Sequence, residues 1–114
     1  MNARFTLRWL VQAGLGIMLV VLLAIHLIVN HRAAPYGLLT YADVVRYYDT
    51  PGIAWMEAVF LMVVTAHCLL GLHSILLDLN LSARITRIAT RMLSFVGVTI
   101  ILYGIWLTRT IAAR

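Results

Sequence analysis

Charged residues are scarce in this sequence. Only 11% of its 114 residues are charged, whereas 63% are hydrophobic, and the mean hydropathy is +0.97. A soluble domain has an apolar share nearer to about half and needs more polar surface than these residues provide. The composition excludes an ordinary soluble domain and indicates that a lipid bilayer surrounds most of the chain. At this length we also expect no soluble catalytic domain beside the membrane part.

Cysteine is nearly absent, and so are the residue combinations of common catalytic sites. The single cysteine, Cys68, excludes an intramolecular disulfide, and no CxxC or Cys/His zinc spacing is present. The apolar runs contain no nucleophile next to a base, no carboxylate pair and no glycine-rich phosphate loop. We therefore expect no catalytic residues in this chain, and we interpret Cys68 as a small buried apolar group.

Lysine is absent. All nine basic residues are arginines, and they flank the apolar runs without forming a continuous stripe. The net charge of +5 and the pI of about 10.2 therefore do not indicate nucleic acid as a partner. We interpret the arginines instead as markers of membrane topology.

Three apolar runs are long enough to span a bilayer. We predict spanning helices at about residues 9–30, 52–77 and 88–107, because about 1.5 Å per residue carries each across a hydrocarbon core of roughly 30 Å. The first run is too long for a secretory signal, so we expect it to stay as an anchor. A polar turn at 78–87 makes the second and third spans antiparallel neighbours. The sequence thus predicts an all-α transmembrane fold, a single three-helix domain over residues 1–114.

The outer loop, residues 33–49, is more polar than the spans. At helical spacing it carries Tyr41, Val44, Val45 and Tyr48. Asp43 and Arg46 lie on the opposite side, which is typical of a short helix in the membrane interface that covers one end of the bundle. An irregular loop whose tyrosines anchor to headgroups explains the pattern about equally well.

The arginines divide between the two sides of the predicted bundle. One side carries Arg4, Arg8, Arg84, Arg87 and Arg91. The other side carries Arg32, Arg46, Arg109 and Arg114. Because cytoplasmic loops carry the excess of basic residues, this five-to-four division favours an integral membrane protein with its amino terminus inside.

Histidines are the most informative polar residues in the spans. His26, His67 and His73 lie within apolar runs, and His31 lies just beyond the first. Ionisable groups inside a membrane are costly, so they are interpreted first as functional residues. Four histidines in so apolar a chain therefore direct attention to the first two spans.

The second span carries a stripe of polar and small residues. His67, Gly71, Ser74 and Asp78 recur at helical spacing and share one face of the helix. This stripe suits a porphyrin, because an axial histidine needs an open face and Gly71, one turn away, has no side chain to strike the macrocycle. A packing groove, in which His67 hydrogen-bonds to a second helix, explains the stripe about equally well.

His26 and His67 lie at different predicted depths. Counted from Trp9, His26 is about 26 Å across the membrane, whereas His67 is about 17 Å across when counted from Asp78. The mismatch of ~9 Å argues against one haem held by both histidines, so each needs a second histidine from another subunit. An interfacial histidine that caps a helix end is the alternative for His26.

His73 lies about 120° around the helix from His67, and we expect it at the level of headgroups or haem propionates.

The third span has a face of small residues. That face carries Thr90, Ser94, Gly97, Gly104 and Thr108. Small residues let membrane helices approach closely, so we expect a partner helix to pack there.

In the second span, Glu57 lies near the helix amino terminus, where the helix dipole favours a carboxylate, and this structural role competes with a role in proton relay.

The second span contains a motif with a known counterpart. The run from His67 through Gly71 to Asp78 resembles the second-helix motif of the membrane-anchor subunits of succinate dehydrogenase and fumarate reductase, a histidine, a glycine four positions on and an aspartate seven further. The resemblance extends over all three spans and their loops. It implies a cytochrome b type anchor that packs against a second anchor subunit, holds haem b between the two, and docks a flavoprotein and an iron–sulfur protein on the cytoplasmic face.

By position, the resemblance makes His67 a haem ligand and Asp78 a residue near the quinone pocket. The family often has a tyrosine after this aspartate, whereas this chain has Leu79. The run from His26 to His31 resembles the first-helix histidine of two-haem members, which makes His26 the ligand of an outer haem. The family pairs two types of anchor, and this chain, which lacks the longer amino-terminal motif of the C-type anchor, is more similar to the D-type anchor.

The function implied by the resemblance is electron transfer between succinate and quinone in the cytoplasmic membrane of a bacterium or archaeon. The chain would bind haem b, one or two copies shared with the partner anchor, and quinone, without a succinate site of its own. At the inner level, the candidate groups for the quinone oxygens are Arg8, Trp9, His73 and Asp78. The alternative is a haem-free structural anchor or assembly subunit whose histidines pack across helices.

Overall fold

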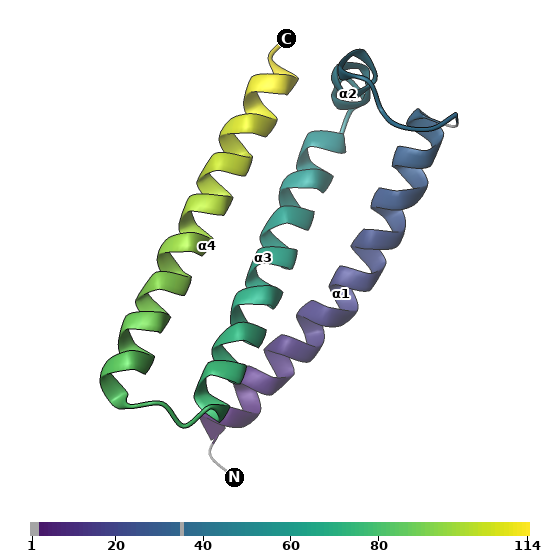
Figure 1. Cartoon of the computed structure of the whole chain (residues 1–114). Coiled ribbons are helices and arrows are strands. Elements are labelled where there is room, and N and C mark those ends of the chain that lie inside the picture. Colours follow the sequence, from purple (N-terminus) through teal and green to yellow (C-terminus); the bar gives the residue numbers. More distant parts are fainter. Residues whose placement is uncertain (1–2, 35) are drawn as a thin grey trace.

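The computed structural model, which describes residues 3–34 and 36–114, contains four helices in these residues. They are α1 (Ala3–Ala33), α2 (Tyr41–Tyr48), α3 (Ile53–Asp78) and α4 (Ala83–Ala112). The start of α1 and the α3–α4 turn lie at one end of the molecule, and α2 and the carboxyl terminus lie at the other (Figure 1). We name these the inner and the outer end, after the predicted orientation.

Three of the helices can cross a bilayer. α1, α3 and α4 have 31, 26 and 30 residues and are long and apolar enough to span a membrane. In lipid, a helix satisfies its backbone hydrogen bonds within itself, which is why these apolar runs form helices and not open strands. The predicted all-α transmembrane fold is confirmed.

The spanning helices extend beyond the predicted runs, because backbone hydrogen bonding continues after the apolar residues stop. α4 begins at Ala83 and not at residue 88, so the turn before it comprises only residues 79–82. Ser82 caps this helix, since its hydroxyl oxygen accepts a hydrogen bond from the Ile85 backbone N at 3.4 Å. Asn80 has a φ of 49°, the left-handed conformation that asparagine tolerates in a tight turn.

The outer loop contains the short helix α2. Thr40 and Asp43 form a capping box, in which each side chain accepts a hydrogen bond from the backbone N of the other, at 3.3 Å for Thr40 Oγ1 and 2.9 Å for Asp43 Oδ2. Hydrogen bonds from the hydroxyl and the backbone of Thr40 hold the pKa of Asp43 below its ordinary value. The buried residue of α2 is Tyr47, whereas Tyr41 on the predicted apolar face is exposed. The other members of that face, Val44, Val45 and Tyr48, are half-buried and Arg46 is exposed, so most of the predicted face points inward and Tyr47 extends it.

α3 is the central helix of the bundle. It packs against α1 on one side and α4 on the other (Figure 1). Gly97 and Gly104 of α4 face Leu69 and Leu61 of α3. Because these glycines serve a contact within the chain, the prediction that they receive a partner helix is wrong. Their missing side chains let α4 approach the leucines of α3.

Most apolar side chains of the bundle point outward. The buried hydrophobic residues of the described chain are Tyr47, Ile53 and Val63. Cys68 is exposed, so its interpretation as a buried group is wrong. The outer surface of a spanning bundle meets lipid or other membrane helices, and a weakly polar thiol is tolerated there as a small apolar group.

We expect the double substitution Gly97→Val and Gly104→Val to weaken the packing of α4 on α3. A side chain at either position would collide with a leucine of α3, and such overpacking typically costs about 1–3 kcal/mol. The measurement is the free energy of unfolding in mixed detergent micelles, followed by circular dichroism. Gly14→Val is the matched control, because a Cβ at Gly14 meets no atom within 4 Å. Equal stability of the double variant and this control would contradict the close contact.

Candidate functional site

Four polar side chains from three helices meet near the outer end of the bundle, and we name them the outer cluster. They are His26 and Asn30 of α1, Tyr47 of α2 and Glu57 of α3. Gly52, with a φ of 86°, supplies the left-handed turn that leads from α2 into α3 and so places Glu57 beneath α2.

The Glu57 carboxylate is the centre of the outer cluster. Its two oxygens lie 2.9 and 3.0 Å from His26 Nδ1, and the Tyr47 hydroxyl donates a hydrogen bond to Oε1. The Glu57 side chain is 12% exposed and the His26 side chain 29%. Asn30 Nδ2 donates to the His26 backbone oxygen at 2.8 Å and lies 3.4 Å from the Tyr47 hydroxyl. The cluster therefore ties α1, α2 and α3 together through a partly buried carboxylate.

Tyr47 remains a hydrogen-bond donor in this arrangement. Burial, followed by its hydrogen bond to Glu57, raises the pKa of Tyr47 well above the ordinary value for tyrosine. A neutral hydroxyl donates to the carboxylate, whereas a phenolate would repel it. The outer cluster is thus a set of matched donors and acceptors around one negative charge.

His67 lies deeper in the bundle, in a contact between α1 and α3 that we name the inner notch. It comprises Gln12 and Gly16 of α1 together with His67 and Gly71 of α3. Gln12 Nε2 donates to the His67 backbone oxygen at 3.1 Å. A Cβ at Gly16 would lie 3.2 Å from Cε1 of the His67 ring, and a Cβ at Gly71 would lie 3.1 Å from Gln12 Nε2. Two glycines therefore make room for the imidazole and the amide.

Two polar atoms of the inner notch lack a partner. Among the described residues, Gln12 Oε1 and His67 Nδ1 are buried and make no hydrogen bond. Buried polar groups in folded proteins nearly always have a partner, so unpaired ones need an explanation such as a ligand, water or another subunit. The described residues contain no group of three or more His, Cys, Asp or Glu side chains that could hold a metal ion. Any metal at His67 therefore needs most of its ligands from outside this chain.

The two sites lie at different depths. His26 contacts Glu57, whereas His67 lies against Gly16, and the spacing from Gly16 to His26 equals the spacing from Glu57 to His67. Ten residues of helix correspond to roughly 15 Å along the axis. This offset exceeds the ~9 Å expected from span ends, because the contacts between α1 and α3 set the register directly. One metal centre does not join the two histidines.

Arg8 and His73 meet at a third place, nearer the inner end. They line a cavity of about 270 Å³ with Leu69, Leu70, Thr90, Leu93 and Ser94. The hydroxyls of Thr90 and Ser94 donate to backbone oxygens of their own helix, at 2.8 and 3.0 Å. Their oxygens still have a free lone pair, so this polar cavity offers donors on one side and acceptors on the other.

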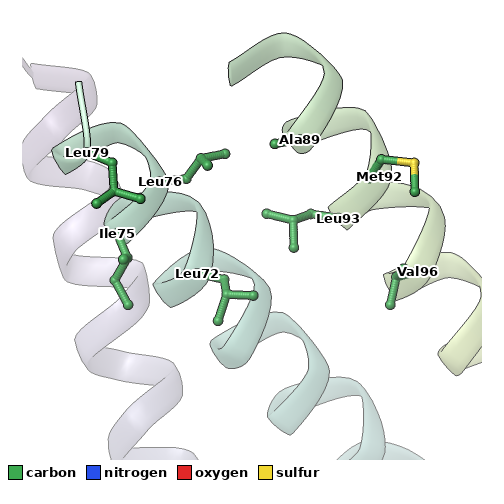
Figure 2. Close-up of a pocket in the computed structure, with 8 residues that line it drawn as sticks. All are labelled: Leu72, Ile75, Leu76, Leu79, Ala89, Met92, Leu93 and Val96. Atoms are coloured by element: carbon green, nitrogen blue, oxygen red, sulfur yellow. The ribbon is translucent and has the colours of Figure 1, made fainter. Parts of the chain in front are cut away.

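An apolar groove between α3 and α4 adjoins the polar cavity. The groove has a volume of about 510 Å³, and Figure 2 shows the eight residues that line it. They are Leu72, Ile75, Leu76, Leu79, Ala89, Met92, Leu93 and Val96. Leu93 lines both spaces, so the polar cavity and the apolar groove meet at one side chain.

The remaining predicted residues lie apart from these sites. Trp9 is 64% exposed, and neither it nor Asp78 lines the polar cavity. Ser74 is exposed and donates to the Leu70 backbone oxygen at 3.0 Å. The predicted stripe on the second span therefore divides: His67 and Gly71 face α1, whereas Ser74 and Asp78 lie on the surface.

Sequence reasoning missed several members of the two clusters. They are Gln12, Gly16, Asn30 and Tyr47. The chain has a single glutamine, and its position inside an apolar run was a usable signal for a buried polar contact. The other three carry no comparable signal, because a glycine in a membrane helix and a polar residue near its end are both common.

We expect Tyr47→Phe to loosen α2 from the bundle. The substitution removes a hydrogen bond to a partly buried carboxylate, which typically contributes about 1.5–3 kcal/mol. The measurement is hydrogen exchange of the α2 backbone amides, together with the free energy of unfolding in mixed micelles. Tyr41→Phe is the matched control, because Tyr41 is 65% exposed. Unchanged protection of α2 in Tyr47→Phe would show that the outer cluster does not hold this helix.

Comparison with known proteins agrees with this architecture. No protein-family model and no solved structure matches the chain. A succinate dehydrogenase hydrophobic membrane anchor subunit from Archaeoglobus fulgidus is 30% identical to it over 101 residues, which cover 89% of this chain and 86% of the relative. The similarity extends over most of both proteins, and the three long apolar helices of the structure agree with the name of a hydrophobic membrane anchor. The chain belongs to the family of hydrophobic membrane-anchor subunits of succinate dehydrogenase.

Proposed function

We propose that this anchor subunit binds haem b together with a second anchor subunit and takes part in electron transfer between succinate and quinone. The single observation that carries the proposal is the placement of the His67 imidazole, an ionisable ring within a spanning helix, at the α1–α3 contact beside Gly16. Succinate itself would be oxidised elsewhere in the complex, by a flavoprotein subunit, with an iron–sulfur subunit between the two. This chain would hold that assembly at the membrane.

The residues of the inner notch fit a haem. Imidazole is a usual axial ligand of haem iron, and Gly16 leaves room for the His67 ring at the α1–α3 contact. Haem b, when bound, supplies a one-electron carrier within the membrane. The offset of roughly 15 Å between His67 and His26 supports two separate haems, each with its second axial histidine from the partner anchor.

The polar cavity and the apolar groove together fit a quinone. Arg8 donates hydrogen bonds to a carbonyl oxygen, and His73 can give or take the proton that quinone reduction requires. The apolar groove beyond Leu93 suits an isoprenoid tail, since its lining is almost entirely hydrocarbon. Asp78 and Trp9 lie outside this lining, so we assign the quinone contacts to Arg8 and His73 first.

The proposed orientation places the inner end in the cytoplasm. Figure 1 places the start of α1 and the α3–α4 turn at this end, where α1 carries Arg4 and Arg8 and the beginning of α4 carries Arg84 and Arg87. An excess of arginine beside spanning helices marks the cytoplasmic side of a bacterial or archaeal membrane. The flavoprotein and iron–sulfur subunits would therefore dock on this end, and α2 would cover the opposite one.

A haem-free structural anchor is the second candidate, and one observation favours it. Gln12 already bonds the His67 backbone, and the His67 ring packs against Gly16 within the same chain. Small residues with a polar side chain between them are a common way to hold membrane helices together. The two functions differ in haem content, which is measurable on the purified complex.

We expect His67→Ala to remove one haem b from a complex that still assembles, because the substitution deletes an axial ligand. The measurement is the reduced-minus-oxidised visible spectrum, with haem quantified per complex. His26→Ala is expected to remove a different haem. His31→Ala is the control, since His31 is exposed and outside both clusters. Unchanged haem content in assembled His67→Ala would leave the structural anchor as the better function.

We expect Arg8→Gln to weaken quinone binding. Loss of a hydrogen bond from a charged donor typically costs about 1.5–3 kcal/mol, so KM for quinone should rise roughly 10-fold to 100-fold. The measurement is succinate:quinone reductase activity of the complex, compared with its activity toward a soluble electron acceptor. Arg4→Gln is the matched control, because Arg4 lies one turn earlier in α1 and does not line the polar cavity. An equal KM for the two variants would exclude Arg8 as a quinone contact.

A further inference from the structure

Glu57 has no role in the function proposed above, although its carboxylate joins side chains of two other helices in the outer cluster. Both of its oxygens approach the same nitrogen, His26 Nδ1, at 2.9 and 3.0 Å. Its remaining contact is the hydroxyl of Tyr47, which comes from a different helix. Hydrogen bonds from two helices fix the position of the Glu57 carboxylate. The carboxylate in turn fixes the orientation of the His26 ring.

The contact defines which ring nitrogen of His26 carries the proton. A carboxylate can only accept hydrogen bonds, so the hydrogen lies on Nδ1. In a neutral imidazole Nε2 then has a free lone pair, and this is the form that binds a metal. The nearest described polar group to Nε2 is Asn30 Nδ2 at 3.4 Å, and that amide makes its shorter bond, 2.8 Å, to the His26 backbone oxygen. Nε2 can therefore give up its long contact with Asn30 and bind a metal instead.

The ring is also held in orientation by packing. Phe60 lies one turn after Glu57 on α3, and its ring centroid is 4.9 Å from that of His26, with an angle of 32° between the planes. His67 differs on this point, because its Nδ1 has no partner among the described residues. Both histidines lie at the α1–α3 contact, but only His26 has a carboxylate bonded to its Nδ1.

We propose that Glu57 is a positioning residue for the outer haem, which orients His26 and fixes its tautomer so that Nε2 is presented to the iron. The inference rests on the function proposed above, in which His26 is an axial ligand. A carboxylate that accepts the Nδ1 hydrogen raises the basicity of the imidazole and stabilises ferric iron relative to ferrous iron. Glu57 therefore lowers the midpoint potential of the haem bound by His26 and leaves the other haem unchanged.

The test compares redox titrations of the intact purified complex, followed by visible spectroscopy, in the parent protein and in Glu57→Gln. The amide keeps the size of the side chain and can still accept from Nδ1, but it removes the charge. We expect both haems to remain and one of two redox transitions to move to a more positive potential. That transition is the one that disappears in His26→Ala. Asp49→Asn is the matched control for loss of a negative charge at the outer end, because Asp49 is exposed, and it should move neither transition.

Two further variants keep the proposal testable if Glu57→Gln fails to assemble. Tyr47→Phe leaves the carboxylate in place but removes its competing donor, so the same transition should move to a more negative potential. Glu57→Ala removes the positioning group altogether and should weaken haem binding at His26 by roughly 10-fold to 100-fold. Haem retention under detergent challenge measures this loss.

The outcomes separate the positioning role from the proposed function. If His26→Ala removes one haem but none of the Glu57 and Tyr47 variants alters that haem, the role of Glu57 is overturned and the ligand assignment stands. A shift in the transition that survives in His26→Ala would also overturn it. If His26→Ala keeps every haem, then His26 is not a ligand and the role of Glu57 fails with that assignment, whereas the proposal for His67 is decided separately by His67→Ala.

Discussion

A bilayer gives the helices of this chain no hydrophobic reason to associate, because lipid tails are as apolar as the side chains they would replace. The bundle must therefore be held by close packing and by the few polar contacts between helices. Glycines provide the close packing: Gly97 and Gly104 bring α4 to α3, and Gly16 and Gly71 bring α1 to α3. The central position of α3 follows, since it carries the opposing side chains on both of its faces.

The polar contacts between α1 and α3 lie at two depths and differ in how completely they are satisfied. In the outer cluster, the Glu57 carboxylate has donors from His26 and Tyr47, so it holds three helices in register. In the inner notch, Gln12 Oε1 and His67 Nδ1 are buried without a partner in the described chain. Unpaired polar atoms are expensive where water is excluded. The outer cluster is thus fully paired around its carboxylate, whereas the inner notch has unused hydrogen-bonding capacity among the described residues.

The chain belongs to the succinate dehydrogenase anchor family. Under the function proposed above, the two places have a common purpose, because histidines at two levels would provide binding positions inside the membrane. The amphipathic space at the inner end, where the polar cavity meets the apolar groove at Leu93, lies beside the same helices. The short α2 covers the far end and is fixed there by Tyr47, whose hydroxyl remains a neutral donor.

The sequence by itself determined the fold class, the three spans, the antiparallel pairing of α3 and α4, and the family, because hydropathy, helical period and the spacing from His67 to Asp78 are local properties of the chain. Only the tertiary structure decided which residues meet. Gln12 and His67 are 55 positions apart, and nothing in either segment specifies their register. The spacing of Gly97 and Gly104 along α4 is the same whether they face α3 or a partner helix. Tyr47 is the buried residue of α2, where its hydroxyl bonds to Glu57 beneath it. Packing between helices depends on rotation and depth as well as on period, and these are set by contacts across the whole bundle.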